Sequence, residues 1–233
     1  MGYLQRAMAQ APDDRLVLTL LAKVNLCECA KRFSSNPKEQ QQIGIDAVET
    51  YLAHHPPDRT MLIWQLEINT LRGRFEDSLV LLDRMLEASP DDPELLSLKA
   101  YNLVKLGRPR EALAPIEAAL REDASADNRS SAAVIHFQLS DDERALDLIR
   151  KAIPEMSRKE REDAWAGSVL LIRIAAATNL GRTDQVKIGL DDFRAAAPGV
   201  RTISQIRKWM DPRAMSAGHE PLYAALRKAG IPD

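Results

Sequence analysis

Paired acidic residues are the most frequent candidates for chemistry in this chain. They stand at Asp13-Asp14, Asp91-Asp92, Asp141-Asp142 and Asp191-Asp192. Two neighbouring carboxylates can act as general acid and general base when their pKa values are driven apart. The first three pairs, however, precede segments with a helical pattern, where an aspartate caps free N–H groups and meets the positive end of the helix dipole. We expect the fourth pair to lie in mid-helix and to face solvent.

Two further clusters could be metal ligands, Cys27-Glu28-Cys29 and His54-His55. A structural zinc site needs four ligands with paired spacing, and no second Cys or His pair stands in suitable register. The two cysteines would point about 200° apart on a helix, so a mutual disulfide is not expected. We interpret the cysteines as small buried hydrophobes and the histidines as cations that stabilise a helix C-terminus before Pro56. The sequence therefore predicts no metal site and no cofactor.

The chain also lacks the local motifs of known catalytic sites. It has no Gly-rich phosphate loop, no nucleophile elbow and no Ser/His/Asp constellation. We therefore predict no catalytic residues and a protein that is not an enzyme.

Composition and charge narrow the class of protein further. The 233 residues carry a formal net charge of -2, which argues against a dedicated nucleic-acid or anionic-membrane binder. No run of 18 uncharged apolar residues predicts a transmembrane helix, and the longest apolar run, 169–177, is broken by Arg173. The N-terminus lacks the layout of a signal peptide. These features favour the cytoplasm, or the periplasm if a targeting segment lies upstream.

A repeat runs along the chain and can be aligned on a glycine. Gly73 and Gly107 are 34 residues apart, Ser140 follows 33 residues later, and Gly181 is a fourth case. Around each, a helix with an Asp or Ser cap ends at the glycine, and a second helix starts within three residues and runs to a proline. Further proline markers with adjacent polar residues stand at Pro12, Pro56, Pro90 and Pro198.

The apolar pattern fits two helices packed as a hairpin. In the unit beginning at Pro93, the first helix has a stripe of Leu96, Ala100 and Leu103, and the second has Ala112, Ile116 and Ala119. Small residues recur where the helices would cross, and larger residues recur four positions on. The first set is Ser78, Ala112, Ala145 and the bulkier Val186, and the second is Leu82, Ile116, Ile149 and Leu190.

A 34-residue helical hairpin of this kind resembles the tetratricopeptide repeat (TPR) family, over roughly residues 13 to 198. The resemblance implies an all-α fold, a right-handed superhelical solenoid of antiparallel hairpins. The expected units are 13–56, 59–92, 93–125, 126–156 and 160–198. Two departures stand out. Lys99 occupies a position that is usually apolar, and the first unit has a longer turn in which Asn36 and Glu39 can form a capping box.

Both ends of the array differ from the repeat. Residues 3–10 resemble the last half of a second helix without its partner, which indicates a longer chain, although a short terminal helix would look the same. After Pro198, Ile203, Ile206 and Trp209 share one face of a short helix. Glu220-Pro221 then opens another helix with Leu222 and Leu226 directed inward. We expect residues 199–233 to cap the last repeat.

The tail also resembles sequences that follow TPR arrays in bacterial class III adenylate cyclases and in CadC-like winged-helix transcription regulators. The residues that carry this likeness begin at Phe193, pass Asp211-Pro212 and end at Tyr223–Asp233. The resemblance implies that a cyclase or DNA-binding domain lies upstream, and that the solenoid is the regulatory C-terminal part of a signalling protein. A free-standing adaptor or assembly factor is the alternative. An RNA-binding helical repeat would need a basic groove.

In a stacked array the first helices line the inner wall, which we expect to bind a protein or peptide segment, from a partner or from an upstream domain. The predicted wall residues are Ile63, Glu67, Thr70, Ser97, Tyr101, Lys105, Val134, Phe137, Leu171 and Asn179. TPR proteins that hold chaperone C-termini use Lys, Asn and Arg here, whereas this chain has Ile63, Glu67, Ser97 and Ser130. An amphipathic helix therefore fits better than an acidic C-terminus. The alternative is a wall that packs on the solenoid itself or on the C-terminal cap.

Overall fold

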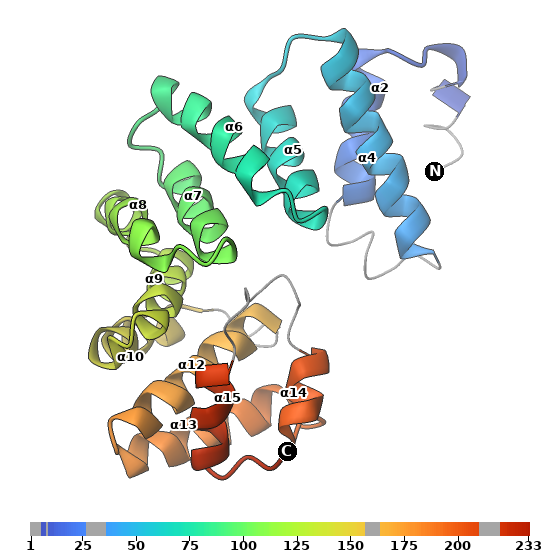
Figure 1. Cartoon of the computed structure of the whole chain (residues 1–233). Helices are drawn as coiled ribbons and strands as arrows, with labels where there is room; N and C mark the ends of the chain where they lie inside the picture. The colour runs from blue at the N-terminus through green and yellow to red at the C-terminus, as the bar shows by residue number, and fades with distance from the viewer. Residues whose placement is uncertain (1–5, 8, 27–35, 157–163, 210–219) are drawn as a thin grey trace. The chain divides into compact units, whose positions relative to one another are not determined.

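The computed structural model describes residues 6–7, 9–26, 36–156, 164–209 and 220–233. The regular structure of these ranges is entirely helical, which confirms the predicted all-α fold class (Figure 1). The chain forms two compact units, Met1–Arg74 and Phe75–Asp233. The division falls just after Gly73, in the turn of the predicted repeat 59–92, and the repeat borders themselves stay predictions.

The described part of the first unit includes α2 (Arg15–Leu26), α4 (Pro37–His54) and α5 (Arg59–Leu71). Helix α2 packs along α4, and α4 contacts α5. Gly44 permits the close approach of α2 and α4, because a Cβ there would lie 2.7 Å from Leu26 Cγ. Residues 6, 7, 9 and 10 of the predicted half-helix are helical, whereas Cys27 and Cys29 lie outside the described residues.

The second unit continues as a series of helices that pack in chain order. They are α6 (Phe75–Ala88), α7 (Pro93–Lys105), α8 (Pro109–Glu122), α9 (Ala126–Gln138), α10 (Asp142–Ala152), the 3-10 turn η1 (Ile153–Glu155), α12 (Ala164–Asn179), α13 (Thr183–Ala196), α14 (Ile203–Trp209) and α15 (Glu220–Lys228). Hairpins α7–α8, α9–α10 and α12–α13 stack through contacts of α8 with α9 and of α10 with α12, and α15 lies against α12 (Figure 1).

Helices α5, α7, α9 and α12 all end in the same backbone turn. The turn residues have positive φ, at Gly73 (69°), Gly107 (72°), Ser140 (62°) and Gly181 (69°). In each turn the next residue donates its N–H to a carbonyl five residues earlier, as Arg108 does to Leu103 at 2.9 Å. This bond satisfies a carbonyl that would otherwise be unpaired at the helix end. The predicted glycine positions, and serine as their substitute, are thereby confirmed.

Side-chain caps start the helices where the sequence predicted them. Asp92 accepts from the N–H groups of Glu94 and Leu95 at 3.0 and 3.3 Å, and Asp14 accepts from Val17 at 2.9 Å. Asp141 likewise accepts from Arg144 at 3.3 Å. One aspartate of each of these pairs is therefore occupied with capping, which accounts for the pairs without any acid–base role.

The hairpins α7–α8 and α9–α10 bury the small and large residues that the pattern predicted, whereas Val186 and Leu190 of α13 are only half-buried. Ala112, Ala145, Ile116 and Ile149 are fully buried, so α7 with α8 and α9 with α10 approach closely. Lys99, which breaks the apolar stripe of α7, is half-buried and pairs with Asp83 of α6 at 2.6 Å. The lysine stem thus packs between the helices while its charged end reaches a carboxylate at the surface.

One carboxylate joins α2, α4 and α5 of the first unit. Asp58 caps α5 by accepting from Met61 N–H at 3.0 Å. It also accepts from the hydroxyl of Tyr51 on α4 at 2.9 Å and from Arg15 on α2 at 3.1 Å. The Met61 amide, followed by Tyr51 and Arg15, lowers the pKa of Asp58. Burial first, and then Asp58, raises the pKa of Tyr51.

Replacing Asp58 with asparagine should weaken the first unit in a pH-dependent way. Asparagine can still cap α5, so Asp58→Asn removes mainly the charge that Arg15 and Tyr51 face, at a cost of about 1 kcal/mol or less for this partly exposed site. Because the folded pKa of Asp58 is lowered, its contribution is present above the ordinary aspartate pKa and is lost as the pH falls through the folded value. Urea unfolding at pH 7 and at pH 3 should show a difference from the parent chain that shrinks at the lower pH. A constant difference would contradict this role.

Ser140 should be replaceable by glycine with a gain in stability. A non-glycine residue with φ of 62° is strained by about 1–2 kcal/mol, and the flexibility of glycine in the unfolded chain offsets part of the relief. We expect Ser140→Gly to stabilise the second unit by about 0.5–1 kcal/mol and to raise Tm by roughly 1–3 °C. Ser140→Ala keeps the strain and serves as the control. An equal rise in Tm for both variants would rule out the backbone explanation.

Candidate binding surfaces

We call the predicted residues on α5, α7, α9 and α12 the first-helix wall, and its parts differ in accessibility. On α5, in the first unit, Ile63, Glu67 and Thr70 are all half-buried. Thr70 donates its hydroxyl to Leu66 O at 3.0 Å, which turns this side chain back to its own helix. Trp64 is half-buried against the apolar core of this unit. Ile63 and Glu67 thus remain partly open to a ligand.

On α7, in the second unit, Ser97 and Tyr101 retain access to solvent, whereas the Lys105 ammonium nitrogen is buried. Ser97, Tyr101 and Lys105 are half-buried. The Lys105 ammonium nitrogen lies 5.1 Å from the centre of the Tyr101 ring, a cation–π distance. The pair fixes an aromatic face and a positive charge side by side on one helix.

Most of the predicted wall positions of α9 and α12 are closed. Val134 and Phe137 on α9 are 6% and 7% exposed, and Leu171 on α12 is fully buried. Asn179, the last predicted residue, is exposed and donates its side-chain amide to Asp142 of α10 at 3.2 Å. A ligand that approaches the surface of the second unit as it stands can therefore reach the α7 positions but not Leu171.

The C-terminal helices cover α12. The residues expected to face inward, Ile203, Ile206, Leu222 and Leu226, are buried in the same core as α12. Trp209 of α14 lies so close to Gly167 of α12 that a Cβ on this glycine would be 1.8 Å from the Trp209 ring. Trp209 also meets the Phe193 ring edge-on, with centroids 5.7 Å apart. The C-terminal helices thus cover part of the surface of α12.

Charged contacts hold the cap helices to one another. Arg207 of α14 lies 4.6 Å from the centre of the Tyr223 ring on α15. Arg227 pairs with Glu220 at 2.8 Å and with Asp233 at 2.7 Å. Burial raises the pKa of Tyr223, in part against the effect of Arg207. Arg207 and Arg227 therefore have acidic or aromatic neighbours that account for them structurally.

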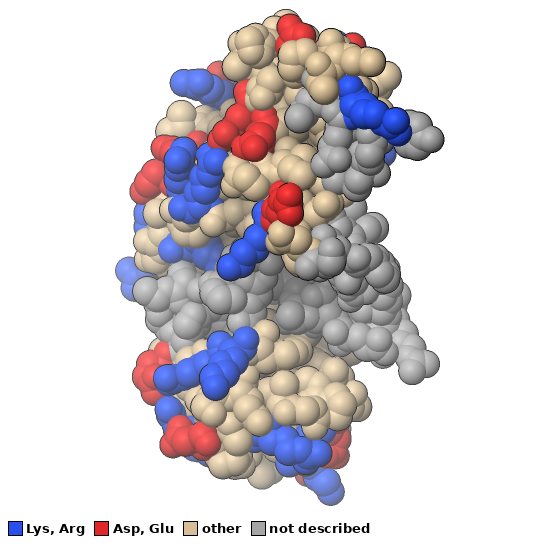
Figure 2. Space-filling view, turned by 90° about the vertical axis from the view of Figure 1, so that its right-hand side faces the viewer, with Lys and Arg blue, Asp and Glu red and all other residues tan. Residues whose placement is uncertain are grey.

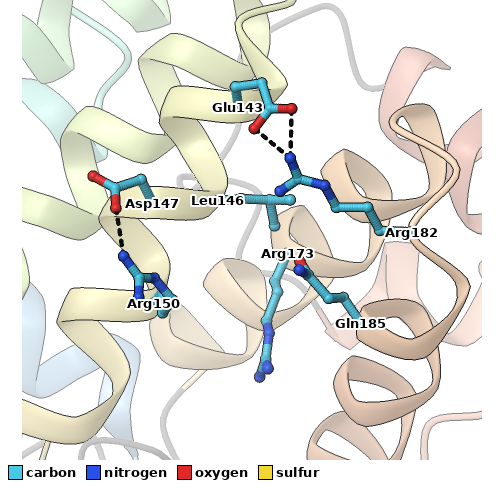
Figure 3. A pocket seen from close by; sticks show the side chains of 7 residues that line it. All are labelled: Glu143, Leu146, Asp147, Arg150, Arg173, Arg182 and Gln185. Carbon is cyan, nitrogen blue, oxygen red and sulfur yellow. Dashed lines mark hydrogen bonds and ion pairs between the residues drawn. The ribbon is translucent and has the colours of Figure 1, made fainter.

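The second unit has another hollow, which the sequence did not predict as a site. Helices α10, α12 and α13 enclose a cleft of about 530 Å³ lined by Glu143, Leu146, Asp147, Arg150, Arg173, Arg182 and Gln185 (Figure 3). We call it the α10–α13 cleft. Arg182 donates to both carboxylate oxygens of Glu143, at 2.5 and 2.6 Å. Arg173 reaches Asp192 of α13 at 2.6 Å.

One signal for this cleft was present in the sequence. Arg173 interrupts an otherwise apolar run, and between Gly167 and Asn179 the structure buries every residue except these two: Arg173 and Asn179. The pattern shows that a charge leaves an apolar helix. The pattern does not predict that Arg150 of α10 and Arg182, just before α13, line the same cleft as Arg173.

The surface in view in Figure 2 carries charges of both signs, with basic and acidic side chains interspersed over it. Within the described ranges, no group of three or more His, Cys, Asp or Glu residues could hold a metal ion. In the same ranges no helix is long and apolar enough to cross a membrane.

Comparison with known proteins identifies the fold. The tetratricopeptide repeat family model matches residues 70–134. YrrB, whose crystal structure is described as a TPR protein with an unusual peptide-binding site, aligns with a TM-score of 0.55 and 13% identity over 88% of this chain and 96% of its own. A TPR protein from Parabacteroides merdae aligns with a TM-score of 0.60 and 14% identity over 97% and 90%. No curated protein matches the sequence. The chain thus has the TPR solenoid fold.

Replacing Gly167 with alanine should detach the C-terminal cap from α12. The added Cβ would overlap the Trp209 ring, and such overpacking costs about 1–3 kcal/mol. We expect faster tryptic cleavage at Arg207 and Lys208, the basic residues of α14, and a lower Tm. Gly199→Ala is the matched control, because its Cβ would meet nothing within 4 Å. Cleavage of Gly167→Ala at the parent rate would contradict the packing described.

Proposed function

We propose that the chain is a protein-interaction module that binds a partner segment on its first-helix wall. The observation that supports this most is the accessibility of the α7 residues Ser97 and Tyr101, in a helix whose opposite face is buried in the core. Partly exposed aromatic surface beside polar groups is typical of recognition sites. Stacked helical repeats commonly bind through such surfaces, and YrrB, with the same fold, is described as having a peptide-binding site.

The chemistry of the wall favours an amphipathic helix as the bound segment. TPR proteins that hold chaperone C-termini carry a clamp of Lys, Asn and Arg at the positions that are Ile63, Glu67 and Ser97 in this chain. Without that clamp, a free acidic C-terminus has no set of donors to hold it. An apolar stripe could instead cover Tyr101, whose ring is backed by the buried Lys105 ammonium.

A peptide-display selection tests this function. A library of helical peptides is panned against the chain, and binding of the enriched peptides is measured by fluorescence anisotropy. Ser97→Arg places a long side chain on the wall, so we expect affinity to fall by about tenfold or more, the equivalent of one lost well-packed contact.

The matched control is Ser89→Arg, which adds the same side chain at an exposed position after α6. We expect Ser89→Arg to bind like the parent chain. Failure to enrich any peptide, or equal binding by the two arginine variants, would count against the wall as the binding surface.

We further propose that the module is the C-terminal part of a larger bacterial signalling or transcription-regulatory protein that acts in the cytoplasm. This rests on the resemblance of the tail from Phe193 to Asp233. An immunoblot of fractionated source cells should then show a cytoplasmic band well above 26.0 kDa. A band near that mass would favour the alternative, a free-standing adaptor.

A further inference from the structure

The α10–α13 cleft carries more cations than carboxylates. On α10, the single carboxylate of Asp147 is shared by Lys151 at 2.7 Å, Arg150 at 2.9 Å and Arg144 at 3.6 Å. Lys151 and Arg150 together lower the pKa of Asp147. Asp147 therefore has more cationic partners than it can neutralise, and of these Arg150 lines the cleft.

The ion pairs at the cleft can be exchanged at low cost. The Arg150 side chain is 78% exposed, and in the pair across the cleft Arg182 is 38% and Glu143 is 62% exposed. Ion pairs this exposed contribute little to stability, and a released Glu143 would be hydrated by water. A guanidinium that binds a new carboxylate in bidentate geometry regains at least as much. Asp147 would keep Lys151 as its partner after Arg150 had moved.

Arg173 and Leu146 form the inner part of the cleft. Arg173 is 20% exposed and is held by Asp192, so it contributes fixed positive charge rather than a mobile arm. Figure 3 shows Leu146 between the Arg150 and Arg182 side chains, which come from different helices. Leu146 is 6% exposed and forms the floor of the cleft, so the contacts with a ligand would come from the arginines.

The same features disfavour a nucleic acid. Glu143, Asp147 and Asp192 remain at the cleft, and a backbone with a charge on every phosphate would be brought against them. A peptide can place its charges selectively. The volume of about 530 Å³ also lies in the range of pockets that hold several side chains.

We propose that the α10–α13 cleft is a second binding site, separate from the first-helix wall, that takes an acidic protein segment. In it Arg150 and Arg182 exchange their internal carboxylates for those of the ligand, and Arg173 supplies fixed charge. This site does not depend on the proposed function of the wall.

Fluorescence anisotropy with defined probes tests the site. The probe is a fluorescein-labelled peptide of alternating glutamate and leucine pairs, compared with its glutamine counterpart and with a single-stranded oligonucleotide. We expect the acidic peptide to bind and the glutamine peptide to bind far more weakly. The affinity for the acidic peptide should fall as the salt concentration is raised from about 50 to about 500 mM, because salt screens the charges.

Two substitutions shift the affinity in opposite directions. Arg182→Ala removes a cleft cation and should weaken binding at least about fivefold, whereas Glu143→Gln removes the competing carboxylate and should tighten it by about twofold or more. Arg121→Ala is the matched control, since it removes the same charge from an exposed position on α8 and should change little. Circular dichroism establishes that each variant is folded.

Three outcomes would overturn the proposal. One is no binding of the acidic peptide by the parent chain, and another is equal loss in Arg182→Ala and Arg121→Ala. The third is tighter, Arg182-dependent binding of the oligonucleotide, which would assign the cleft to nucleic acid. The Ser97→Arg variant, which alters the wall, should bind the acidic peptide normally, so failure at one site is distinguishable from failure at the other.

Discussion

The left-handed turn at the end of α7, α9 and α12 is the constraint on which the rest of the second unit depends. It satisfies the last carbonyls of one helix and starts the next within three residues. Because the connection is short, the two helices must run antiparallel and in contact, and their apolar faces meet each other. Each hairpin still leaves apolar surface at its flank, which the next hairpin covers. The caps at Asp92 and Asp141 fix where each new helix begins.

The end of the second unit shows how this stacking stops. No further hairpin follows α13 in the described residues, and α15 packs on α12 instead, with Trp209 of α14 seated on Gly167. As a result α12 is buried on nearly every side, and its wall residue Leu171 is closed to ligands. Arg173 is the point at which this helix still reaches the surface, and it opens into the α10–α13 cleft. The C-terminal helices thus cover one part of the α12 surface, and the charged α10–α13 cleft lies at another part of it.

The sequence predicted the local elements well, because local rules govern them. Gly107 and Ser140 mark the turns, Asp92 and Asn36 mark the helix starts, and Ile116 lies on a buried stripe, and all of these follow from spacing within one hairpin. Exposure on the wall could not be predicted in this way. Periodicity tells which residues share a face, but whether Leu171 or Phe137 is open depends on helices far along the chain. The Lys99–Asp83 pair and the arginines around Leu146 likewise require the packing of separate helices.

Hydrogen exchange read by mass spectrometry, with and without a peptide selected on the chain, tests the central claim that ligands bind on the first helices. Binding to any surface of the chain would slow exchange somewhere, so the decisive observation is which helix exchanges more slowly. If ligands bind on the first-helix wall, exchange should slow in α7 upon binding and stay unchanged in α8, its hairpin partner. Protection confined to α8, or spread equally over both helices of the hairpin, would contradict the first-helix wall as the binding surface.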